Sequence, residues 1–183
     1  MLHSHSFAKR LTGGLLSFLT PLLLVSCGGN NLDLDALNAQ ALQRQKQVLR
    51  ADSVAIAKYI ADSSFVNVRR QPSGVCIVSR AAGTGDLPRT GQTASVVYKG
   101  MLLTNQVFDQ SRLGPDGLPV PFIFTLGANQ VIPGWEEGIR LMRKGEKAIL
   151  LIPSAWAYGP SGAGNLIPPD APLRFDVELT NLQ

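Results

Sequence analysis

The spacing of apolar positions changes along the chain and divides it into three parts. A mostly apolar stretch spans residues 11–25 and follows the basic residues Lys9 and Arg10. Residues 32–62 contain neither Gly nor Pro, and their apolar side chains recur at roughly helical spacing. Beyond Phe65 the apolar runs are short and are separated by turns that contain Gly and Pro. The pattern therefore predicts a leader, a helical segment and a β-rich domain.

The segment 32–62 is predicted to be a moderately amphipathic helix. Ala, Leu, Gln, Arg and Lys dominate it, and these residue types favour helix. The apolar stripe consists of Leu34, Leu37, Ala41, Val48, Ala55, Ile56, Tyr59 and Ile60. A break at 51–53 is left open, because Asp52 or Ser53 is able to cap a second helical segment.

The β-rich part predicts an α+β domain. Alternation at 93–98 places Val96 and Tyr98 on one face of a strand. Further same-face sets are Phe122 with Phe124, and Leu173 with Phe175, Val177 and Leu179. Residues 148–152 are continuously apolar and predict a central strand, and one short helix fits between residues 133 and 142. We expect a half-open antiparallel sheet that wraps around this helix.

Residues 1–26 have the layout of a secretory signal, with a cationic start followed by an apolar run. The run is too short and too interrupted for a membrane span, which needs about 20 mostly apolar residues. Leu-Val-Ser-Cys at 24–27 resembles the bacterial lipobox, in which the cysteine is acylated and becomes the new N-terminus. An ordinary signal peptide with an incidental cysteine is the alternative. Cys27 is therefore the predicted lipidation site.

The leader predicts where the protein resides. We expect it to be exported and held on the periplasmic side of the cell envelope by a membrane anchor, with the outer membrane favoured over the inner one. Acyl chains contribute about 0.8 kcal/mol per buried CH₂, so a multiply acylated cysteine gives stable attachment. The predicted units are a signal peptide at 1–26, a tether at 27–31, a helical segment at 32–72 and a folded domain at 73–183.

Composition removes several classes of function. The 183 residues are 45% apolar and 16% charged, which is typical of a globular protein. The sequence shows no basic cluster with interleaved aromatic residues, so nucleic-acid binding has little support. Both histidines, His3 and His5, lie in the leader, which leaves no imidazole for Ser-His-Asp or Cys-His hydrolases or for the usual zinc sites. We expect no metal and no cofactor, and we interpret Cys76 as a buried small hydrophobe.

Five sequence blocks then occur in the order found in FKBP-type peptidyl-prolyl cis-trans isomerases. They are Val-Tyr-Lys-Gly-Met-Leu at 97–102, Phe-Asp-Gln-Ser at 108–111, Val-Ile-Pro-Gly-Trp-Glu-Glu-Gly at 131–138, Ala-Trp-Ala-Tyr-Gly at 155–159 with Ile-Pro-Pro at 167–169, and the closing strand at 173–182. One block alone is weak evidence, but five in order are strong. The chain resembles this family over roughly residues 74–182, and the resemblance implies the FKBP-like half-barrel.

The resemblance also implies a pocket for a substrate proline. Its catalytic residues would be Tyr98, Asp109, Trp135 and Tyr158, and its substrate-binding residues would be Phe108, Phe122, Val131, Ile132, Leu166, Ile167 and Phe175. Trp135 would form the floor, while the Ile132 N–H and the Tyr158 hydroxyl would hold substrate carbonyls. Asp109 would act either as a dipole on the twisted carbonyl or as the hydrogen-bond partner that organises Tyr98.

Isomerisation of a prolyl bond needs no nucleophile, because no bond is made or cut. Rotation of a peptide bond crosses a barrier of about 18–20 kcal/mol, since resonance is lost in the twisted geometry. A dry aromatic pocket disfavours the planar amide relative to the twisted one, and only such a difference accelerates the reaction. The expected partners are proline-containing polypeptides among exported proteins. A client-binding chaperone module with little turnover is the alternative.

Two loops at the pocket depart from the family pattern. The loop at 113–119 is longer than in small FKBPs, and the loop at 161–165 is rich in Gly and Ala and has no aromatic residue. Both border the pocket, so the resemblance does not set substrate preference. Some FKBP-type proteins carry a helix before the barrel. Three roles of the segment 32–62 therefore remain open: packing on its own domain, formation of a homodimer, or binding of client polypeptides.

Overall fold

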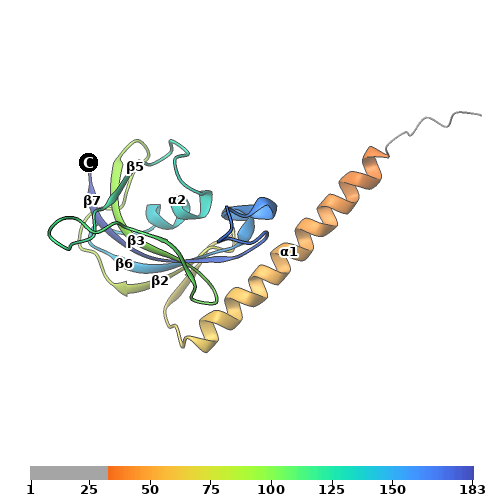
Figure 1. Ribbon diagram of the computed structural model, residues 1–183, viewed down its shortest axis with the longest axis horizontal. Helices are drawn as coiled ribbons and strands as arrows, with labels where there is room; N and C mark the ends of the chain where they lie inside the picture. The colour runs from red at the N-terminus through yellow and green to blue at the C-terminus, as the bar shows by residue number, and fades with distance from the viewer. Residues whose placement is uncertain (1–32) are drawn as a thin grey trace, which may run out of the picture.

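The computed structural model describes residues 33–183 (Figure 1). Its helices are α1 (Leu34–Asp62) and α2 (Pro133–Arg140), and its strands are β1 (Val68–Arg70), β2 (Cys76–Ala81), β3 (Thr93–Leu102), β4 (Val107–Gln110), β5 (Phe122–Thr125), β6 (Lys147–Ile152) and β7 (Leu173–Leu182). Two short 3₁₀ turns, η1 (Ser154–Trp156) and η2 (Gly159–Ser161), lie between β6 and β7. The predicted signal peptide, tether and Cys27 lie outside the described residues.

All seven strands form one antiparallel sheet. Its order is β1-β2-β6-β7-β3-β4, and β5 also pairs with β3. The register of β3 with β7 runs from Ala94 opposite Leu182 to Leu102 opposite Leu173, with a register shift between Ser95 and Val96. The sheet curves around α2 (Figure 1). The predicted α+β fold, an antiparallel half-barrel around one short helix, is confirmed.

The inner face of the sheet packs on α2. This helix starts at Pro133, a residue that suits the first turn because its missing N–H has no intrahelical partner there. A Cβ added at Gly138 would lie 2.7 Å from Leu150 Cδ1, so glycine lets the helix lie directly on β6. Trp135 and Ile139 are the large side chains that α2 buries in the core.

The outer face of the sheet packs on the C-terminal half of α1. Ile56 and Ile60 form a second buried cluster with residues of β2 and β6. Cys76 belongs to this cluster and is 1% exposed, and burial raises the pKa of its thiol. The N-terminal end of α1 projects from the domain (Figure 1). No helix within residues 33–183 is both long and apolar enough to cross a membrane.

The break in the helix considered at 51–53 is wrong, because α1 is continuous through these residues. Asp33 caps its start by accepting hydrogen bonds from the Asp35 and Ala36 N–H groups at 3.1 Å. Asp52 does not cap a second helix, because its carboxylate contacts Ser154 instead. The predicted helical segment 32–72 also contains β1, which pairs with β2 and places the start of the sheet before residue 73.

Candidate active site

Trp135 stands at the centre of an aromatic cluster on the inner face. Its side chain is 4% exposed and comes from the first turn of α2. Four rings surround it, with centroid distances of 5.2 Å to Tyr98, 5.6 Å to Phe175, 5.8 Å to Phe124 and 6.1 Å to Phe122. Edge-to-face or tilted arrangements of this kind are favourable for aromatic pairs. The cluster therefore provides a rigid, largely apolar floor.

A cavity of about 400 Å³ lies above this floor. Its lining residues are Tyr98, Asp109, Phe122, Asn129, Gln130, Val131, Ile132, Trp135, Tyr158 and Phe175. The structure thus brings together eight of the eleven catalytic and substrate-binding residues predicted from the sequence. Asn129 and Gln130 were not predicted. Asn129 has φ of 53°, so the polar turn before the third sequence block was the available signal.

Three predicted residues do not line the cavity. Phe108 packs edge-on against Phe175, which lines the cavity, with ring centroids 5.5 Å apart. Ile167 is 6% exposed and belongs to the inner core. Leu166 is 50% exposed and lies outside the cavity, in the turn that the Ala163–Ile167 bridge closes.

Asp109 is bound on both carboxylate oxygens. Oδ2 accepts a hydrogen bond from the Tyr98 hydroxyl at 2.6 Å, and Oδ1 accepts one from the Gln110 N–H at 2.8 Å. This geometry favours the second predicted role, in which Asp109 organises Tyr98. Burial, together with the bond to Asp109, raises the pKa of Tyr98. Burial and then the Asp109 charge raise the pKa of Tyr158, so both phenols stay protonated at neutral pH.

Two N–H donors near the floor have no acceptor within residues 33–183. The Ile132 N–H makes no intramolecular hydrogen bond there, whereas the Ile132 carbonyl accepts from the Trp135 N–H at 3.0 Å. The indole Nε1 of Trp135 is buried and has no hydrogen-bond partner in the described part of the chain. A buried unpaired donor such as the indole N–H is uncommon and often marks a functional site, whereas Ile132 is only partly buried beside the cavity. The Ile132 N–H is therefore free to bind a substrate carbonyl.

The same region carries the match to a known family. The FKBP-type peptidyl-prolyl cis-trans isomerase profile matches residues 85–180. The chain belongs to this family. Both the predicted family and the predicted enzyme class are confirmed.

Individual relatives agree with the family match. FK506-binding protein 1 of Dictyostelium discoideum is 44% identical over 106 residues, which is 58% of this chain and 95% of that protein. The probable isomerase FkpA of Neisseria meningitidis is 33% identical over 150 residues, which is 81% of this chain. The chain spans 53% of that relative, and 25% of the Arabidopsis thaliana isomerase FKBP53.

Solved structures resemble the fold of this FKBP-type chain. An isomerase from Pseudomonas syringae is 33% identical, with a TM-score of 0.63 and coverage of 75% of this chain and 95% of that one. FkpA from Escherichia coli is 34% identical, with a TM-score of 0.58 and coverage of 82% and 70% respectively.

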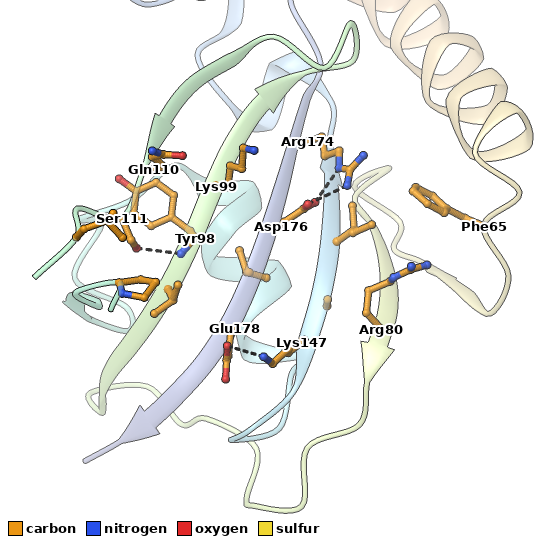
Figure 2. A pocket seen from close by; sticks show the side chains of 16 residues that line it. Phe65, Arg80, Tyr98, Lys99, Gln110, Ser111, Lys147, Arg174, Asp176 and Glu178 are labelled. Carbon is orange, nitrogen blue, oxygen red and sulfur yellow. Dashed lines mark hydrogen bonds and ion pairs between the residues drawn. The ribbon is translucent and has the colours of Figure 1, made fainter. Parts of the chain in front are cut away.

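A larger groove of about 520 Å³ lies on the outer face of the sheet (Figure 2). Ion pairs cross its floor, with Arg174 Nε 2.7 Å from Asp176 Oδ1 and Lys147 Nζ 3.1 Å from Glu178 Oε2. Such a charged and open floor does not exclude water from a planar amide. The smaller aromatic cavity is therefore the candidate active site of this FKBP domain.

Proposed function

We propose that the protein accelerates cis-trans isomerisation of Xaa-Pro bonds in exported polypeptides by stabilising the twisted amide without covalent chemistry. The observation that carries this proposal is the combination, around one cavity, of a buried aromatic floor and an unpaired backbone donor. Trp135 supplies the floor, and Ile132 supplies the donor beside it. Tyr158 adds a protonated hydroxyl at the rim.

The mechanism follows from the polarity of the two amide geometries. The planar amide has more charge separation than the twisted one, so transfer into an apolar cavity disfavours it more. The Ile132 N–H and the Tyr158 hydroxyl hold the carbonyls that flank the proline and keep the chain in a turn. Asp109 fixes the Tyr98 ring in the cavity wall. No residue has to gain or lose a proton.

Turnover of a short Xaa-Pro peptide by residues 28–183, followed with an isomer-specific readout, tests the proposal. Acceleration over the uncatalysed rate, which takes tens to hundreds of seconds, is the expected result. A folded protein that binds the peptide without accelerating isomerisation would favour the client-binding chaperone instead.

We also propose that the mature protein is lipid-anchored at Cys27 on the periplasmic side of the envelope, with the outer membrane favoured. The support is the order of a cationic start, an apolar run and Leu-Val-Ser-Cys at 24–27. Cys27→Ser should move the protein from the membrane fraction to the soluble fraction. Unchanged membrane attachment of the variant would contradict the anchor.

A homodimer through α1 is proposed for the full-length protein. Leu34, Leu37 and Leu42 lie in the N-terminal half of α1 and are 68%, 46% and 50% exposed. Leu37→Glu combined with Leu42→Glu should reduce the mass measured by sedimentation from two chains to one. Peptide turnover should not change, because neither residue contacts the cavity. A monomeric wild-type chain would contradict the homodimer.

A further inference from the structure

Two contacts join α1 to the segment between β6 and β7. Asp52 is 3% exposed, and its Oδ2 accepts hydrogen bonds from both the backbone N–H and the hydroxyl of Ser154 at 2.7 Å. Two helical turns earlier, Arg44 forms an ion pair with Asp170. The segment 154–170 is thus attached to α1 at both ends, and in Figure 1 the dark blue turns lie beside the helix.

The contact between Asp52 and Ser154 is buried and fixes the position of both residues. A buried carboxylate is costly unless it is hydrogen-bonded, so its position depends on Ser154. Ser154 is the first residue of η1 and is fully buried, and Pro153 before it provides no side-chain cap. The N–H at the start of a helical turn has no partner within the turn, so another acceptor normally satisfies it. Here α1 supplies the acceptor from a residue 102 positions away in sequence.

Tyr158 lies between the two attachment points. The Ala157 N–H donates to the Ser154 carbonyl at 2.9 Å, and the Asp170 N–H donates to the Gly159 carbonyl at 2.9 Å. Ser154 is therefore joined by one backbone hydrogen bond to Ala157, which precedes Tyr158. Asp170 is joined in the same way to Gly159, which follows it. The Tyr158 hydroxyl makes no hydrogen bond within residues 33–183, so its place at the cavity depends on the backbone that carries it.

We propose that Asp52 is a positioning residue of the isomerase, and that Arg44 assists it: together they hold the segment 154–170 so that the Tyr158 hydroxyl stays over the cavity. This inference rests on the proposed function and adds α1 to the parts that support the active site. Neither residue touches the substrate. Both act through Tyr158.

A double-mutant cycle in the full chain tests the proposal. Asp52→Ala should lower kcat/KM about fivefold, mainly through KM, whereas in the Tyr158→Phe background the same change should cost less than about twofold. Asp52→Asn keeps an oxygen acceptor for Ser154 and should restore most of the activity. Lys58→Ala, which removes an exposed pair with Asp62 on the same helix, is the matched control and should change nothing.

A second variant, Arg44→Ala, and a hydrogen-exchange measurement keep the proposal testable if Asp52→Ala fails to fold. The Arg44–Asp170 pair is partly exposed, so Arg44→Ala should fold and should show a smaller loss of kcat/KM that also vanishes in Tyr158→Phe. Amide exchange in both variants should accelerate in 154–170 but not in 76–81. Equal losses with and without the Tyr158 hydroxyl, or unchanged kcat/KM and exchange, would overturn the proposal.

Discussion

The inner face of the sheet carries rings around a cavity of about 400 Å³, whereas the outer face carries ion pairs around a groove of about 520 Å³. Each face is also covered by one helix. On the inner face α2 contributes Trp135 to the cavity itself. On the outer face α1 buries Ile56 and Ile60 and leaves the groove uncovered beside them.

The difference shows that chemical character, rather than volume, identifies the site. Ion pairs such as Lys147–Glu178 are partly solvated and contribute about 0–1 kcal/mol. The inner cavity has a single carboxylate, Asp109, and both of its oxygens are already occupied by donors. The inner face can therefore offer a dry site with few fixed donors, and the outer face cannot.

Removal of the floor should have the largest effect. Trp135→Ala should lower turnover by roughly 100-fold or more, because the apolar surface under the substrate proline is lost. It should also destabilise the domain by about 3–5 kcal/mol, as expected for a buried large-to-small change. Peptide turnover and denaturant unfolding measure the two losses. Trp135→Phe keeps an aromatic ring and should lose less of both, and unchanged turnover in Trp135→Ala would refute the floor.

A matched change on the outer face should affect stability alone. Ile149 is 4% exposed and belongs to the outer cluster, so Ile149→Ala should lower the free energy of unfolding by about 2–5 kcal/mol. The kcat/KM of the folded fraction, measured well below the transition temperature, should stay within about twofold of wild type. A large loss of turnover would show that the two faces are not separable.

Two variants of Asp109 distinguish the two roles predicted for this residue. Asp109→Ala should lower kcat/KM by about tenfold, because Tyr98 loses its partner in the wall. Asp109→Asn retains an oxygen that accepts from the Tyr98 hydroxyl and should lose less. Equal losses in the two variants would instead favour a role for the negative charge acting on the substrate carbonyl.

The smallest effect is expected from pH. Burial raises the pKa of both Tyr98 and Tyr158 above the ordinary tyrosine value of 10.0, so kcat/KM should stay flat from neutral pH to about pH 9.5. The stability contributed by each phenol is present below the unfolded pKa and is lost as pH rises from there toward the folded pKa. Unfolding midpoints measured above pH 10 should therefore fall, less steeply in Tyr98→Phe. A kcat/KM that declines with a midpoint below pH 9 would contradict this.

Much of the fold was predictable, because the spacing of apolar residues and the positions of turn residues are local signals in the sequence. Alternation at 93–98 and the Gly-free segment 32–62 predicted β3 and α1. The resemblance then supplied most of the cavity. The bond between Asp52 and Ser154 was not predictable, because the pattern around a residue does not reveal a partner far away in sequence. The exposure of Leu166 was not predictable either, because it depends on the fold of the loop between η2 and β7, for which the pattern gives no local signal.

The position of β7 has a consequence for how the enzyme is made. This strand lies between β3 and β6 and pairs with both, although β3 precedes it by a long stretch of chain. During synthesis the cavity therefore lacks Phe175 until the last strand is delivered. Strand pairing over such separations is slow, because the loop must close before any contact compensates its entropy. Each newly made molecule therefore completes the wall of the cavity only after β7 has paired with both of its neighbours.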